Sequence, residues 1–216
     1  MQKASGFCFF MAGKKIPGLC GPSGARYNET DKGEGGGEMR LFVAIPLPDE
    51  AKIALRHSVW ALEARWTAGR ILAPESYHVT LAFLGEQPEE GLAKIMAAMD
   101  RCRCPAFPAV VGEFGLFSQR GGHVLWRSVW SPELEKAQGQ LSRELERAGF
   151  ALESRPFLPH VTLARRVVLP SELLPEFLSA GVKRFHIPVE GMALMRSQLS
   201  PQGASYQQLY QLHFDN

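Results

Sequence analysis

Two five-residue segments with the same letters, His-Val-Thr-Leu-Ala, occupy residues 78–82 and 160–164. Side chains in an extended strand alternate between two faces, so the histidine, threonine and alanine of each copy share one face. The valine and leucine share the other face, and Phe83 continues that apolar set after the first copy. The pattern predicts two strands, each with one chemical face and one face packed in the core.

Apolar residues elsewhere recur every three to four positions, which is the period of a helix with one buried face. In chain order, the predicted helices run from Asp49 to Trp66, from just after Pro88 to about residue 102, from Ser131 to Gly149 and, briefly, over residues 171–180. Asp49 and Ser131 are residue types that begin helices, and Gly149 is one that ends them. The first and third helices each lead through a proline-containing turn into one copy of the repeat.

Further β-rich runs surround these units. Strands are predicted over residues 41–45, 107–117, 123–129, 185–189, 192–199 and 205–214. Residues 119–122 have the composition of a hairpin turn, as do residues 200–203. The duplicated helix-then-strand unit therefore predicts an α+β fold of two similar lobes of antiparallel sheet, with outer helices, around a central cleft.

Residues 1–38 differ in composition from the rest of the chain. They are rich in glycine, with three consecutive glycines at 35–37, and no Lys-Ser or Lys-Thr follows as a phosphate-binding loop requires. We therefore expect a flexible N-terminal extension over residues 1–38 and a bilobal domain over residues 39–216, with Met39 as a candidate start.

Composition and charge exclude several classes of protein. A chain of 216 residues that is 45% hydrophobic can bury a core, and its net charge of +2 does not indicate long, non-specific binding to nucleic acid. The four cysteines lack the spacing of a zinc site, which favours reduced thiols. No apolar run approaches the ~20 residues of a membrane span. We expect a monomeric, cytoplasmic protein without a membrane partner.

The repeated histidine and threonine are the candidate chemical groups. Imidazole has a pKa near ~6.5, so one histidine can accept a proton while another donates one at neutral pH. His78 and His160, facing one another, would suit displacement at phosphorus without a metal or other cofactor. Thr80 and Thr162 lie two residues further on, where their hydroxyls can bind the phosphate oxygens.

These motifs resemble the two-histidine (2H) phosphoesterases, and within them the bacterial and archaeal RNA 2′,3′-cyclic phosphodiesterases, also called 2′-5′ RNA ligases. The resemblance extends from Met39 to the C-terminus and includes residues 39–45, 77–85 and 155–165. It implies that His78 is the proton donor and His160 the proton acceptor. It also implies that Thr80, Thr162 and Arg165 bind phosphate, with Arg166 as a weaker candidate.

The reaction implied by this resemblance opens a ribose 2′,3′-cyclic phosphate to a 2′-phosphate, and some relatives join 2′-5′ RNA ends. The partners would be RNA 2′,3′-cyclic phosphate ends or small cyclic nucleotides. A non-catalytic protein that binds RNA ends is the alternative, and a zinc protein ranks last because each repeat strand offers one ligand.

The remaining histidines and the tryptophans have no partner that suggests chemistry. We assign to structure or surface the histidines His57, His123, His186 and His213. We assign mostly to the core the tryptophans Trp60, Trp66, Trp126 and Trp130. Phe83 and Trp126 remain candidates for stacking a base.

A chain that begins at Met39 should match the full chain in thermal stability and in turnover of a 2′,3′-cyclic phosphate, because the glycine-rich residues before it carry no core pattern. Thermal unfolding and steady-state kinetics of the two chains measure this. A clear loss in either quantity would show that residues 1–38 pack or take part in function.

Overall fold

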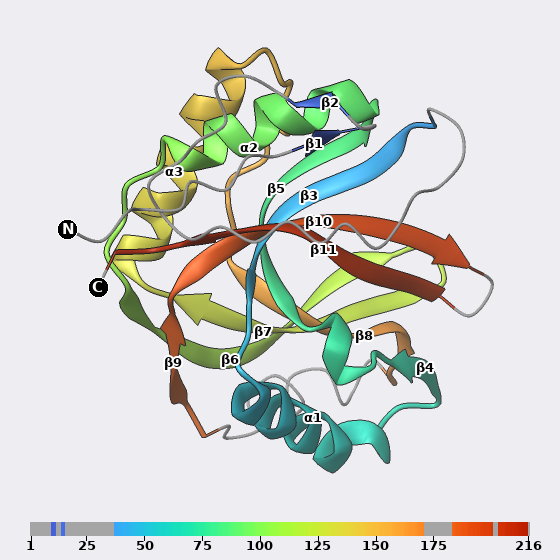
Figure 1. The fold of residues 1–216 in the computed structure, drawn as a ribbon. Helices are drawn as coiled ribbons and strands as arrows, with labels where there is room; N and C mark the ends of the chain where they lie inside the picture. Colours follow the sequence, from blue (N-terminus) through green and yellow to red (C-terminus); the bar gives the residue numbers. More distant parts are fainter. Residues whose placement is uncertain (1–9, 12–13, 16–36, 171–182, 201–202, 216) are drawn as a thin grey trace.

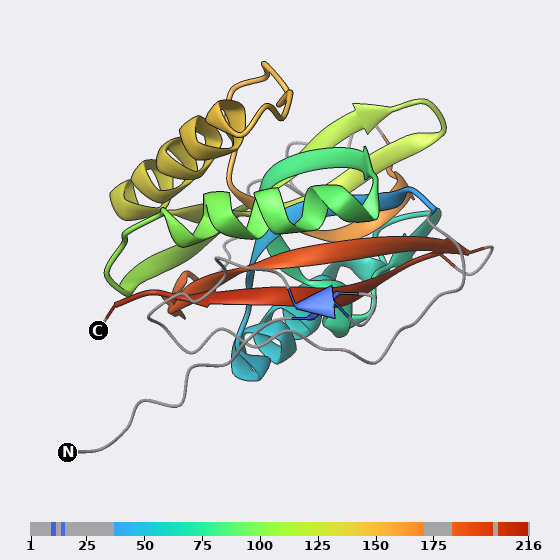
Figure 2. The same ribbon diagram turned by 45° about the horizontal axis from the view of Figure 1, so that its top comes forward.

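The computed structural model describes residues 10–11, 14–15, 37–170, 183–200 and 203–215 (Figures 1 and 2). Before residue 37 it describes β1 (Phe10–Met11) and β2 (Lys14–Lys15), which form a two-residue antiparallel ladder. The flexible extension therefore stays a prediction. The helix expected over residues 171–180 lies outside the described residues.

A nine-stranded antiparallel sheet forms the centre of the described structure, and it is strongly curled (Figure 1). Its strands follow the order β11-β10-β3-β5-β8-β7-β6-β9, with β4 paired to β8 off this path. Their bounds are β3 (Met39–Pro46), β4 (Ala68–Ile71), β5 (His78–Gln87), β6 (Phe107–Gln119), β7 (Gly122–Trp130), β8 (His160–Val168), β9 (Phe185–Val189), β10 (Gly191–Ser200) and β11 (Gly203–His213). The predicted strands are confirmed, and β4 is one that the sequence pattern did not indicate.

Three α-helices lie outside the sheet in the described part of the chain: α1 (Asp49–Glu63), α2 (Leu92–Asp100) and α3 (Pro132–Arg147). In Figure 1, α1 lies on one side of the molecule, while α2 and α3 lie together on the other. Arg101, just after α2, joins this pair by donating to Glu144 at 2.6 Å. None of the described helices is long and apolar enough to cross a membrane.

The helix ends correct two details of the sequence interpretation. Asp49 is the first residue of α1 and Pro48 holds the N-cap position, so Asp49 is not the cap. The helix ends at Glu63, and Trp66 lies beyond it, packed against the core from the following turn. Gly149, by contrast, follows α3 with φ of +93°, a left-handed conformation that favours glycine and ends the helix there.

The predicted two lobes share this sheet. β11, β10, β3 and β5 form one half, and β8, β7, β6 and β9 form the other. Each half contains a strand, a helix and then a repeat strand: β3, α1 and β5 in the first, β7, α3 and β8 in the second. Between the repeat strands, the recorded backbone pairing is that of Val79 with Val161. Both valine side chains are buried, so the halves are joined through the core face of the repeat.

Val79→Ala and Val161→Ala should each lower the free energy of unfolding by about 2 kcal/mol, because each removes two buried methyl groups at the junction. For a domain of this size, the melting temperature should fall by roughly 4–8 °C. Thermal and urea unfolding measure the change. Val168→Ala is the control, because this β8 valine is 41% exposed and its loss should change stability by less than about 0.5 kcal/mol. Equal effects at all three positions would contradict the junction described here.

Candidate active site

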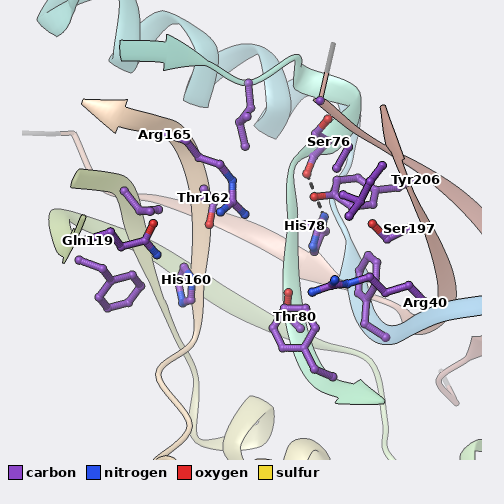
Figure 3. A pocket seen from close by; sticks show the side chains of 18 of the residues that line it. Arg40, Ser76, His78, Thr80, Gln119, His160, Thr162, Arg165, Ser197 and Tyr206 are labelled. Carbon is purple, nitrogen blue, oxygen red and sulfur yellow. Dashed lines mark hydrogen bonds between the residues drawn. The ribbon is translucent and has the colours of Figure 1, made fainter. Parts of the chain in front are cut away.

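The register of the repeat strands brings the predicted catalytic residues together. Because β5 and β8 are antiparallel and pair at Val79 and Val161, the residue before each valine lies toward the residue after the other. His78 is thereby directed toward Thr162, and Thr80 toward His160. All four side chains line one cleft of about 1510 Å³ between the two halves (Figure 3). The sequence prediction that two matched His-Thr pairs form one site is consistent with this geometry.

Each imidazole is oriented by a backbone carbonyl two residues earlier in the chain. His78 Nδ1 lies 2.9 Å from the carbonyl oxygen of Ser76, and His160 Nδ1 lies 2.7 Å from that of Leu158. A carbonyl oxygen only accepts hydrogen bonds, so Nδ1 must carry the proton in both rings. The neutral form of each ring therefore has its lone pair on Nε2, ready to accept a proton from a molecule in the cleft.

Burial keeps both histidines neutral in the free protein. The pKa of His78 is lowered from 6.5 to about 4, chiefly by loss of hydration and to a smaller extent by the charges of His160 and Arg165, while the hydrogen bond to Ser76 raises it. The pKa of His160 is also lowered, first by burial and then by the Arg165 guanidinium. Both groups are thus prepared to act as bases at neutral pH, and an anion between them would favour their protonated forms.

A bulge in each repeat strand changes which side chains face the cleft. In β5, Ala44 pairs with Thr80 and Val43 with Ala82, which leaves Leu81 as an extra residue. In β8, Trp126 pairs with Thr162 and Leu125 with Ala164, which leaves Leu163 as the extra residue. Both bulged carbonyls are satisfied, that of Leu81 by Gln138 at 3.4 Å and that of Leu163 by the backbone N–H of Leu72 at 2.8 Å. The two bulges occupy the same position, three residues after each histidine.

The prediction that Phe83 faces the core is therefore wrong. Strict alternation would place it there, but the bulge reverses the alternation, so Ala82 is buried and Phe83 is 50% exposed in the cleft. The same reversal brings Arg165 to the cleft in β8. These two residues are counterparts, each five positions after its histidine, and they make the two halves of an otherwise matched site chemically different.

Aromatic rings support both imidazoles. Phe42 and Tyr206 lie against His78, with ring centroids 4.9 and 5.0 Å away. Phe117 and Trp126 lie against His160 at 5.0 and 5.7 Å. Trp126 was expected mostly in the core but instead forms part of this support. The prediction that Trp60 and Trp130 lie in the core is wrong, because their side chains are 55% and 59% exposed.

The structure adds cleft residues that the sequence did not indicate. They include Arg40, Phe42, Ser76, Gln119, Ser197 and Tyr206, several of which are labelled in Figure 3. Arg40 comes from β3 and extends toward the cleft beside His78 and Thr80 (Figure 3). None belongs to a repeated motif, and Tyr206 lies 128 residues after His78 in sequence (206 − 78), so spacing offered no signal for them. The Ser76 and Leu158 contacts use backbone atoms, which residue identity cannot reveal.

The remaining histidines lie away from the cleft, as the sequence interpretation assigned them. His57 stacks on Trp60 of α1, and His123 Nδ1 lies 3.4 Å from Ser118 Oγ. His186 and His213 also do not line the cleft. Among the residues that the structure describes, no three His, Cys, Asp or Glu side chains are grouped as a metal site would require. Metal-independent chemistry stays a prediction.

The curled antiparallel fold and the duplicated His-Thr pairs in its cleft define the class of the two-histidine phosphoesterases. The model of the 2′-5′ RNA ligase superfamily matches residues 48–200, and the chain belongs to this family.

Relatives and solved structures agree with this assignment. An RNA 2′,3′-cyclic phosphodiesterase of Thermotoga maritima is 30% identical over 183 residues, which cover 82% of this chain and 96% of the relative. A protein with the same description from Thermus thermophilus is 34% identical over 78% of this chain and 86% of its own length. The crystal structure of TT0787 of Thermus thermophilus is similar with a TM-score of 0.68 and 30% identity, covering 82% of this chain and 98% of that one.

In the free protein, His78 should titrate near pH 4 and His160 below its usual pKa of 6.5, because burial and Arg165 disfavour both imidazolium ions. Addition of a nucleoside 2′-phosphate should raise both pKa values through the negative charge it places between the rings. Histidine side-chain nitrogen shifts, measured by NMR across the pH range, report both effects. Arg165→Gln should raise both pKa values in the free protein. A free-protein pKa of His78 near 6.5 would contradict the burial described here.

Proposed function

We propose that this protein hydrolyses RNA 2′,3′-cyclic phosphate ends to 2′-phosphomonoesters by acid–base catalysis with His78 and His160. The observation that carries the proposal is the matched pair of imidazoles in one cleft, each with Nδ1 held by a backbone carbonyl and Nε2 left for the substrate. The description of the Thermotoga and Thermus relatives as RNA 2′,3′-cyclic phosphodiesterases supports the choice of substrate.

The reaction consists of one displacement at phosphorus. His160 Nε2 accepts a proton from water, whose oxygen attacks the phosphorus atom. The bond from phosphorus to the 3′-oxygen breaks, and His78 donates a proton to that departing oxygen, which leaves the phosphate on the 2′-oxygen. After the reaction His160 is protonated and His78 is neutral, and proton exchange with solvent restores the starting state of both rings. A 5′-hydroxyl of RNA in place of water would give a 2′-5′ linkage by the same steps, which is the ligase activity that the family description suggests.

The donor role of His78 requires the substrate, because its pKa in the free protein is lowered to about 4. A phosphodiester anion between the rings would stabilise the imidazolium form of His78. Thr80, Thr162 and Arg165 all line the cleft, where the two hydroxyls would donate to the non-bridging oxygens and the guanidinium would supply a permanent positive charge. The exposed ring of Phe83, in the position that matches Arg165, is where we place the base of the reacting nucleotide.

A non-catalytic protein that binds RNA ends would need the cleft, the arginine and the aromatic rings, but not two oriented proton-transfer groups. Both histidines are present and both are oriented in the same way, which favours the enzyme. The monomeric state and the cytoplasmic location stay predictions from the sequence.

His78→Ala and His160→Ala should each lower turnover of a 2′,3′-cyclic phosphate by roughly 10²–10⁴-fold, the usual contribution of a general acid or base. Thr80→Val and Thr162→Val should lower it less. EDTA should leave the rate of the unaltered protein unchanged. His123→Ala, which removes a histidine outside the cleft, is the control and should retain full activity. Full activity of either catalytic variant, or inactivation by EDTA, would overturn the mechanism.

A substrate with sulfur in place of the 3′-bridging oxygen separates the two roles. A thiolate leaves without a proton far more readily than an alkoxide, because its conjugate acid has a pKa near ~8.5. On this substrate His78→Ala should recover most of its lost rate, while His160→Ala should stay slow because water still lacks its base. Rescue of His160→Ala alone would exchange the donor and acceptor roles while leaving the site in place.

A further inference from the structure

The cleft carries far more positive charge than the chain as a whole. Its described lining contains five arginines and one acidic residue, Glu153, whereas the net charge of the entire chain is +2. Glu153 is already paired with Arg155 at 2.6 Å, at the end of the cleft that precedes β8. The opposite end holds Arg70, Arg165 and Arg166. Among the described residues, no carboxylate lies within ion-pair distance of these three.

Arg166 reaches this end of the cleft because of its backbone conformation. Neighbouring residues of a strand normally face opposite sides, yet Arg165 and Arg166 both line the cleft. The φ of Arg166 is +55°, and it is the one residue other than glycine with positive φ in the described part of the chain. Gly122 of β7 makes room for this turn, because a Cβ there would lie 2.8 Å from the backbone carbonyl carbon of Arg166. An uncommon backbone conformation thus adds a second arginine to the cleft.

Arg70 joins this pair from another strand. It lies on β4, opposite Arg165 in the register of β4 and β8. Its guanidinium extends to Gly203 at the start of β11, where an added Cβ would overlap Nη2. β4 belongs to one edge of the cleft and β11 to the far edge of the sheet, so Arg70 spans the end of the cleft and depends on the absence of a side chain at Gly203.

The reacting phosphate does not account for all three arginines. Arg165 is already assigned to the reacting phosphate, and Arg166 lies one residue further along β8 from His160. Six fully extended residues would span at most about 20 Å, and the bulge at Leu163 shortens this separation. Successive phosphates of a single strand are much closer together than that, so a strand attached to the reacting nucleotide would bring further phosphates within reach of these side chains. Arginine is well suited to such contacts, since its planar guanidinium donates to two phosphate oxygens at once.

We propose that Arg70 and Arg166, beside Arg165, form a subsite for the phosphates that precede the reacting nucleotide, so that the substrate is an oligonucleotide with a 2′,3′-cyclic phosphate end and not a free cyclic mononucleotide. This inference rests on the proposed function of the same cleft. The strand would leave the reacting centre toward β4, while the terminal base lies toward Phe83.

The test compares kcat/KM for a nucleoside 2′,3′-cyclic phosphate, the corresponding dinucleotide and the trinucleotide, each ending in the same cyclic nucleotide. The dinucleotide or trinucleotide should be preferred by about tenfold or more, the effect of one charge-assisted contact. Replacing the internal phosphates with uncharged methylphosphonates should remove that preference. Equal kcat/KM for all three lengths would overturn the subsite while leaving the proposed function intact, whereas no turnover of any of them would overturn the proposed function itself.

Variants then assign the preference to the named side chains. Arg70→Ala and Arg166→Ala should each lower the ratio of kcat/KM for the longer substrate to that for the mononucleotide, and should reduce the slope of log(kcat/KM) against log[salt] by about 0.7 for each lost phosphate contact. Arg155→Ala is the matched control, because its arginine pairs with Glu153 at the other end of the cleft, and it should keep the ratio. A ratio unchanged by Arg70→Ala and Arg166→Ala, or lowered equally by Arg155→Ala, would overturn the assignment.

A glycine pair tests the position of Arg70 without altering an arginine. Gly203→Ala should displace the Arg70 guanidinium and lower the same ratio. Gly121→Ala imposes similar backbone strain, with φ of +86°, but its new Cβ would meet no atom within 4 Å, so the ratio should be retained. The same loss in both variants would show that strain, and not Arg70, sets the preference.

Discussion

The pairing of Val79 with Val161 determines how the histidines and threonines of the two repeat strands lie relative to one another. Two strands that begin with the same five residues meet in antiparallel orientation at the residue between the histidine and the threonine, so each histidine is directed toward the threonine of the other strand. A pairing shifted by one residue would turn one of the two histidines into the core, because alternate residues of the shifted strand face opposite sides. The apolar face of the repeat therefore fixes the geometry of its polar face, and stability and chemistry depend on the same two strands.

Burial of the imidazoles has an electrostatic consequence for the order of events. The cleft of the free protein combines several arginines with two histidines, and protonating both rings there would add charge to a site that is already positive and poorly hydrated. An anionic phosphodiester reverses this balance, since it offsets the arginines and stabilises an imidazolium. In the proposed mechanism, substrate binding and protonation of His78 are therefore coupled, and the imidazolium form of His78 is largely restricted to the complex with substrate.

The sequence was sufficient for the fold class, the repeat strands and the two histidines, because these depend on periodicity and on a repeated motif. It failed where the backbone departs from regular geometry. The bulges at Leu81 and Leu163 carry ordinary leucines, so no letter marks them, yet they determine that Phe83 and Arg165 face the cleft. The short strand β4 was missed because its segment, Ala68–Ile71, has no apolar alternation and is mostly exposed. Arg40 and Tyr206 reach the site only through the order of strands in the sheet, which local pattern does not contain.

The carbonyls that hold the two imidazoles have an evolutionary consequence. In many active sites a carboxylate orients the histidine, and a single mutation can remove it. Here the acceptors are the main-chain oxygens at positions 76 and 158, which every amino acid supplies. Substitutions at these two positions leave the acceptors in place as long as the turn before each strand is preserved. A relative could therefore carry other residues at both positions and still orient its two imidazoles in this way, and no third side chain would mark the partner of either histidine in its sequence.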